Sequence, residues 1–115
     1  MRSCLSLQNV TSDGVLECSL AAPFACRIVA VRVIDADGIA ADNTNYIDGD
    51  ITGTTGYDSR AANQGALTAG TALNLTLSPG ATVIAAGGEL KAVFAKGGSG
   101  QAAKMGITWT IEPAN

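Results

Sequence analysis

Few side chains in this sequence could support catalysis. The chain contains no histidine, which excludes a serine or cysteine nucleophile activated by an imidazole base. Ser99 lies near Lys96 in the sequence, but neither these residues nor the cysteines match a known nucleophile motif or the spacing of a nucleophile and its base. We therefore expect no enzymatic activity and no cofactor.

The three cysteines, Cys4, Cys18 and Cys26, are an odd number without a CxxC spacing. Such a set is a poor framework for disulfides. A structural zinc site usually needs four Cys or His ligands, and the chain cannot supply them. We expect the three thiols to behave as small apolar residues in a reducing compartment.

Aspartates are concentrated between residues 35 and 58. The string Asp35-Ala36-Asp37-Gly38 is similar to the start of a calcium loop, but the fifth position carries no acid and no glutamate closes the twelve-residue frame. Asp and Asn also favour turns, because their side chains bond to nearby backbone groups. The pattern therefore favours turns, and calcium binding within Asp35–Asp50 is the alternative. In either case the aspartates make one end of the domain acidic.

The overall charge argues against two classes of partner. The net charge is −3 and the pI is about 4.6, whereas non-specific binders of nucleic acid or anionic membranes carry a basic stripe. No apolar run approaches the roughly 18 residues that span a bilayer. The polar residues Gln8, Asn9 and Asp13 interrupt the start of the chain, so we expect no signal peptide.

The sequence consists of short segments in which apolar and polar residues alternate, separated by Gly, Pro, Asn and Asp, which is typical of strands. The clearest is 104–112, where Trp109 is the largest expected core residue. The other expected strands are an N-terminal one at Leu5 and Leu7, then 15–20, 26–34, 46–53, 73–77, 82–85 and 89–96. The stretch 54–71 is less regular and is expected to form a loop with a short helical turn.

About eight short strands with frequent turns indicate an all-β fold, a β-sandwich or a jelly roll. A length of 115 residues fits one domain over residues 1–115, with 1–10 as a candidate N-terminal arm that could add a strand to a neighbour. In the segment 26–34, Arg27 and Arg32 would lie on opposite faces of a regular strand. Only Tyr46 and Tyr57 are available for an exposed aromatic platform.

Several short strings carry a resemblance over roughly residues 20–112. They are Ala22-Pro23-Phe24 before the long strand, Asp42-Asn43-Thr44-Asn45-Tyr46 before a weak one, Gly87-Gly88-Glu89-Leu90, and the Gly-rich connection before the Trp109 strand. The chain resembles the small capsid decoration proteins of tailed bacteriophages, of head-fibre or cement type, in these strings and in the succession of its expected strands. The string at 42–46 is the sharpest part of the resemblance.

The resemblance implies a virion structural protein that decorates and stabilises the outer surface of a phage capsid. It implies assembly in the host cytoplasm, the major capsid protein as partner, and a homo-oligomer, often a trimer at three-fold positions. Candidate capsid or subunit contacts are Arg27, Arg32 and Arg60, with the acidic end directed outward. The alternative is a receptor- or glycan-binding β-sandwich of the fibre-tip or adhesin type.

Overall fold

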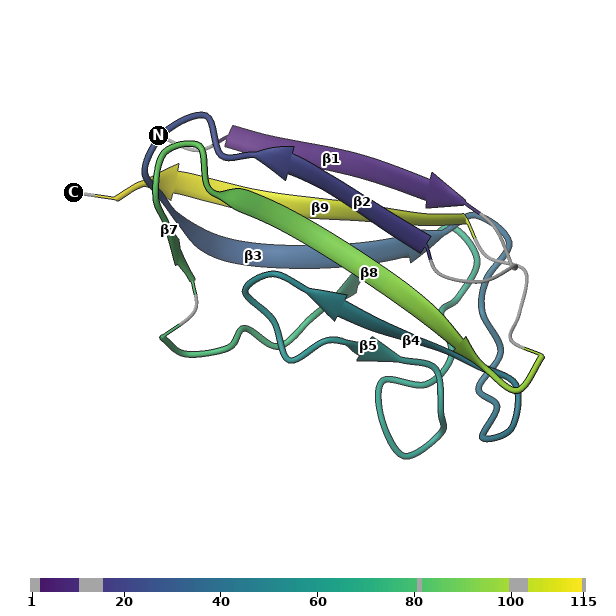
Figure 1. Ribbon diagram of the computed structural model, residues 1–115. Coiled ribbons are helices and arrows are strands. Elements are labelled where there is room, and N and C mark those ends of the chain that lie inside the picture. Colours follow the sequence, from purple (N-terminus) through teal and green to yellow (C-terminus); the bar gives the residue numbers. More distant parts are fainter. Residues whose placement is uncertain (1–2, 11–15, 81, 100–103, 115) are drawn as a thin grey trace.

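The computed structural model describes residues 3–10, 16–80, 82–99 and 104–114, and these form an all-β molecule with nine strands (Figure 1). The strands are β1 (Ser3–Val10), β2 (Leu16–Ala21), β3 (Cys26–Asp35), β4 (Tyr46–Ile51), β5 (Tyr57–Asp58), β6 (Leu73–Asn74), β7 (Val83–Ile84), β8 (Glu89–Gly97) and β9 (Lys104–Pro113). The described residues include no helix long and apolar enough to cross a membrane. The predicted all-β fold is confirmed.

Two antiparallel sheets make up the sandwich. Sheet A has the order β1-β9-β3-β6, with β7 also pairing with β3, and sheet B has the order β2-β8-β4-β5. Strands β1, β2 and β3 alternate between the sheets, and β8 and β9 again lie in different sheets. The N-terminal segment expected as an arm forms β1 and pairs with β9 of its own chain.

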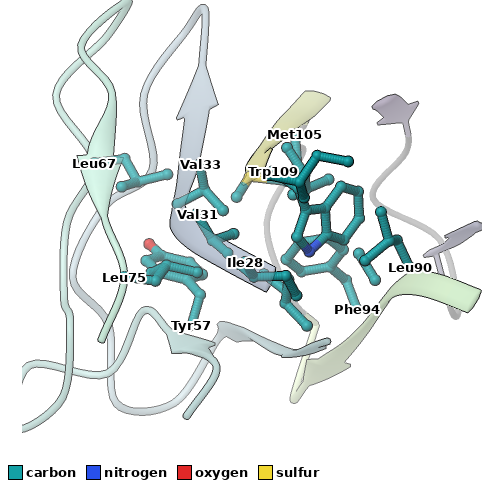
Figure 2. Close-up of a cluster of buried hydrophobic side chains, with 14 of the residues drawn as sticks. Ile28, Val31, Val33, Tyr57, Leu67, Leu75, Leu90, Phe94, Met105 and Trp109 are labelled. Atoms are coloured by element: carbon teal, nitrogen blue, oxygen red, sulfur yellow. The ribbon is translucent and has the colours of Figure 1, made fainter. Parts of the chain in front are cut away.

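The core lies between the two sheets, and the alternation of residue types decides which side chains enter it. Met105, Ile107, Trp109 and Ile111 are fully buried along β9, as their spacing predicts. Opposite them, β8 contributes Leu90, Ala92 and Phe94, which share one face of the strand and are buried. Figure 2 shows Leu90 and Phe94 beside Trp109. Burying one such side chain stabilises the fold by about 1.5–3 kcal/mol, so these two rows carry much of the hydrophobic stabilisation.

Trp109 joins the two sheets by a hydrogen bond as well as by packing. Its indole Nε1 donates to the backbone carbonyl of Thr52, just beyond the end of β4, at 3.1 Å. An indole N–H buried without an acceptor would destabilise the core, so the position of this carbonyl is coupled to that of the ring. Gly49 leaves the room that Phe94 needs, because a Cβ on Gly49 would lie 2.5 Å from the ring.

The predicted strand 73–77 is shorter in the structure, because this segment passes from one sheet to the other. The Leu75 N–H donates to the carbonyl of Val31 in sheet A, while the Ser78 N–H donates to the carbonyl of Gly53, which follows β4 of sheet B. Only Leu73–Asn74 therefore forms regular strand, although Leu75 is buried as expected.

The stretch 54–71 contains a short strand that the sequence analysis did not predict. Tyr57–Asp58 pairs with Asp48 and Gly49 of β4 as the edge strand β5. No helix forms in this stretch; a single turn, closed by a hydrogen bond from the Asn63 N–H to the Arg60 carbonyl, stands where a short helical turn was expected. Among the cysteines, Cys26 is buried and free, and burial raises the pKa of its thiol; the side chains of Cys4 and Cys18 lie outside the described residues.

We predict that Trp109→Phe lowers the free energy of unfolding by about 2–3 kcal/mol, because it leaves a cavity and an unpaired Thr52 carbonyl. Urea unfolding followed by far-UV circular dichroism measures the change. Thr108→Val on the outer face of the same strand is the control and should shift stability by less than about 0.5 kcal/mol. Equal losses in both variants would contradict the role given to the indole.

Candidate functional site

A β-bulge in β3 decides where two of the three candidate arginines lie. The pairing of β3 with β9 shifts between Ile28 and Ala30, which adds one residue to β3. Arg27 and Arg32 are therefore both exposed on the outer face of sheet A, opposite Glu112 and Thr108 respectively. The expectation that they lie on opposite faces is wrong, because one extra residue inverts the alternation of a strand.

We call this surface the arginine face; its members are Arg27, Arg32, Asn74, Val83, Thr108 and Glu112. Arg27 lies 3.5 Å from the Glu112 carboxylate, and its side chain is still 50% exposed. Arg32 donates from Nε to the Asn74 amide oxygen at 2.8 Å, in an exposed position. Val83, beside Arg27 in the pairing of β3 and β7, is 63% exposed. Two oriented guanidinium groups beside an apolar side chain can bind carboxylates of a protein partner.

Arg60 belongs to a different part of the molecule. It follows β5 and donates from both Nε and Nη2 to the Asp58 carboxylate. Its guanidinium also lies over the ring of Tyr46, 4.3 Å from the centroid. Hydrogen bonding to Arg60 holds the pKa of Asp58 below its usual range and raises that of Arg60. The structure thus separates Arg60 from the arginine face and commits it to an internal ion pair.

The two tyrosines do not form an exposed platform. The ring of Tyr46 lies against Gly97, where an added Cβ would be 2.1 Å from the ring, so Tyr46 is held between Gly97 and Arg60. Tyr57 is fully buried and its hydroxyl donates to the carbonyl of Gly65 at 2.6 Å. Burial raises the pKa of Tyr57 well above its usual range.

The string at residues 42–45 ties three loops together at one end of the sandwich. Asp42 Oδ1 accepts hydrogen bonds from the backbone N–H groups of Thr44 and Asn45, both at 2.8 Å. Asn43 Oδ1 accepts from the Ala61 N–H and Asn45 Oδ1 accepts from the Ser99 N–H, each at 2.9 Å. We call residues 42–45, 59–61 and 97–99 the loop end. The string predicted a turn, and the structure adds that its side chains order two further loops.

Most of the aspartates lie on the outer face of sheet B or in turns. Asp48 and Asp50 are exposed on β4, and Asp58 lies opposite Asp48. Burial, followed by the neighbouring charge of Asp58, raises the pKa of Asp48. Asp35 is buried, and its carboxylate accepts the Asp37 N–H at 2.9 Å, as in an Asx turn. Within the described ranges no three Cys, Asp or Glu side chains are grouped so as to hold a metal ion.

Charge divides the two outer surfaces of the sandwich. Together with Glu17 on β2 and Glu89 on β8, Asp48 and Asp50 of β4 form what we call the acidic face of sheet B, in which Lys91 pairs with Glu17 at 3.1 Å. Asp58 beside them is buried and paired with Arg60. The expected acidic end of the domain is therefore in large part a face. A partner could distinguish the acidic face from the arginine face by charge alone.

We predict that Asp42→Ala loosens the loop end, because it removes the acceptor shared by the Thr44 and Asn45 N–H groups. Losing about 1 kcal/mol per hydrogen bond should speed exchange of these two amides roughly fivefold. Hydrogen exchange measured by NMR tests this. Asp42→Asn keeps an oxygen acceptor and is the matched control; equal acceleration in both variants would contradict the assignment.

The pair Asp58–Arg60 should contribute to the acid stability of the fold. Because the folded state lowers the pKa of Asp58, its contribution is present above the unfolded value near 3.8 and is lost as the pH falls through the folded value. Asp58→Asn should therefore lower stability at pH 7 and flatten its loss in acid. A double-mutant cycle with Arg60→Gln, followed by urea unfolding at several pH values, isolates the pair. A coupling that is zero at pH 7, or unchanged in acid, would refute this account.

Of the candidate residues, the structure brings Arg27 and Arg32 together and places Arg60 elsewhere. The ordering roles of Asn43 and Asn45 were missed, because the sequence shows a turn but not the distant loops that it meets. The acidic face was missed for the same reason, since the sequence does not show that the strands 15–20, 46–53 and 89–96 belong to one sheet. No protein-family model, no curated protein and no solved structure matches this chain, so the description of the site depends on its geometry.

Proposed function

We propose that this chain is a virion structural protein that decorates and stabilises the outer surface of a bacteriophage capsid. One observation carries the proposal. The sharpest part of the resemblance, the string at 42–46, consists of the residues that order the loop end and place Tyr46 against Gly97. The string that carries the sharpest part of the resemblance therefore also shapes the surface of this sandwich.

The division of charge supports an orientation on the shell. In this proposal the arginine face lies against the major capsid protein, and the acidic face of sheet B is directed outward. Arg27 and Arg32 are exposed and oriented by Glu112 and Asn74, so they can meet carboxylates with little reordering. Arg60 acts within the fold rather than at the contact. The protein works without catalysis, assembles in the host cytoplasm and occupies the shell as a homo-oligomer, with the trimer as the form that the resemblance implies.

The alternative, a glycan-binding module, gains no support from the aromatic residues. Such a module presents rings to solvent, whereas Tyr57 is buried and Tyr46 is covered by Arg60 on one side and Gly97 on the other. Phe24 packs against the core. A protein contact therefore fits the described surface better than a sugar-stacking platform.

The direct test is to mix the purified protein with capsids of the encoding phage that lack it and to image the particles. Density at symmetry-related positions on the outer surface is the expected result. A shell that stays bare, together with binding on a glycan array, would reject decoration in favour of the alternative.

The orientation is tested by reversing charge on each sheet. Arg27→Glu with Arg32→Glu should reduce occupancy of the capsid about tenfold or more, because like charges across an interface oppose binding. Lys91→Glu on the outer face of sheet B is the matched control and should leave occupancy close to wild type, because that face is directed outward. Greater loss from Lys91→Glu than from the arginine pair would place the contact on sheet B instead.

A further inference from the structure

The open edges of the two sheets differ in how they are protected. Natural sheets protect their edges with short strands, charged residues, prolines or bulges, since an open edge can pair with another chain. On one side of the molecule, the described edge strands β5, β6 and β7 have only two residues each. On the other side, β2 carries the exposed Glu17, held by Lys91 at 3.1 Å. Each of these edges therefore has a recognisable protective feature.

The edge formed by β1 has none of these features. Its eight residues pair with β9 in an unbroken register, from Ser3 opposite Ile111 to Val10 opposite Lys104. The segment Ser3–Val10 contains no charged residue, no proline and no glycine. In Figure 1, β1 runs along the outer rim of sheet A, and the described strands pair with it only through β9.

Hydrogen bonds of the neighbouring strands show which backbone groups of β1 face outward. The Ala114 N–H donates to the Ala25 carbonyl at 3.0 Å, so even-numbered residues of β9 direct their backbone groups toward β3. Beyond the bulge, the Val31 carbonyl accepts from the Leu75 N–H and so points away from β9. The backbone groups of the next residue, Arg32, therefore face β9, where Arg32 lies opposite Thr108, another even-numbered residue. Odd-numbered residues of β9 therefore face β1.

The register between β9 and β1 shows which residues of β1 face β9. Residues 105, 107, 109 and 111 lie opposite 9, 7, 5 and 3. The odd-numbered residues of β1 therefore complete the ladder with β9. Even-numbered residues direct their backbone N–H and C=O groups to the open edge; they are Cys4, Ser6, Gln8 and Val10.

We propose that the β1 edge pairs antiparallel with β1 of a second copy of this chain, joining two A sheets across a two-fold axis. Copies with a net charge of −3 repel each other overall, and β1 is the only described strand of more than two residues that carries no charge. A two-fold contact uses the same strand from both copies, so it needs no further complementary surface. Registers centred on Ser6 or Leu7 bring even-numbered residues opposite even-numbered residues, as the outward groups require.

This two-fold contact is separate from the trimer that the resemblance implies on the shell, and it does not depend on attachment to a capsid. It uses the rim of sheet A, whereas the proposed capsid contact uses the outward surface around Arg27 and Arg32. The pair can therefore form in the purified protein, and its test needs no shell. Failure of the pairing and failure of decoration are separate results.

The test compares Ser6→Pro with Ser6→Ala. Proline at position 6 removes an outward N–H and leaves the bonds to β9 intact, whereas alanine keeps that N–H. Sedimentation equilibrium over a range of concentrations should give dimers for the wild type and Ser6→Ala, and monomers for Ser6→Pro. Far-UV circular dichroism and thermal unfolding of the two variants check that Ser6→Pro folds.

A second variant keeps the proposal falsifiable if Ser6→Pro does not fold. Ser6→Lys places like charges near the two-fold axis, so dimers should dissociate at low salt and recover at high salt. In the wild type, the amides of Ser6 and Gln8 should exchange slowly at high concentration and faster on dilution. A wild type that is monomeric at every concentration, or an oligomer that Ser6→Pro or Ser6→Lys leaves intact, would overturn the proposal.

Discussion

The structure depends above all on the burial of Trp109. This is the largest fully buried side chain, and its ring needs both apolar neighbours and an acceptor for its indole N–H. Phe94 and Leu90 of sheet B supply the neighbours, and the Thr52 carbonyl supplies the acceptor (Figure 2). Because Trp109 belongs to sheet A and the acceptor follows β4 in sheet B, one side chain relates the two sheets in both distance and orientation.

The β-bulge in β3 has consequences for the surface that the core alone would not produce. Without the extra residue, Arg27 and Arg32 would alternate, and one of them would point into the sandwich. With it, Val31 and Val33 remain buried while both arginines are exposed on one face. The same sheet therefore packs its β-branched residues inside and keeps two cations outside. Sheet B carries Asp48 and Asp50 together with Glu17 and Glu89 on its outer face, and the molecule acquires two surfaces of different charge.

Side-chain to backbone hydrogen bonds give the loop end its order. Asp42 closes a local turn, and Asn43 and Asn45 reach backbone groups 18 and 54 residues away. Asp58 and Arg60 add an ion pair beside the same loops, with Tyr46 covering Gly97. Small polar side chains thus order loops that contribute little to the apolar core. The shape of this surface is fixed by hydrogen bonds and not by the burial of apolar side chains.

Residue order alone determined the all-β class, the buried faces of 89–96 and 104–112, and the turn at Asp42, because alternation and turn chemistry are local properties. It also marked Arg27 and Arg32 of one strand as candidate contacts. Tertiary structure decided that a bulge brings them to one face, that Arg60 pairs with Asp58, and that β5 exists. It also decided that 3–10 completes sheet A as an edge. The bulge, β5 and the edge strand depend on pairing between segments that are distant along the chain, and such pairing is absent from any local pattern of residues. Asp58 and Arg60 are close in sequence, but Tyr46, over which Arg60 lies, comes from β4.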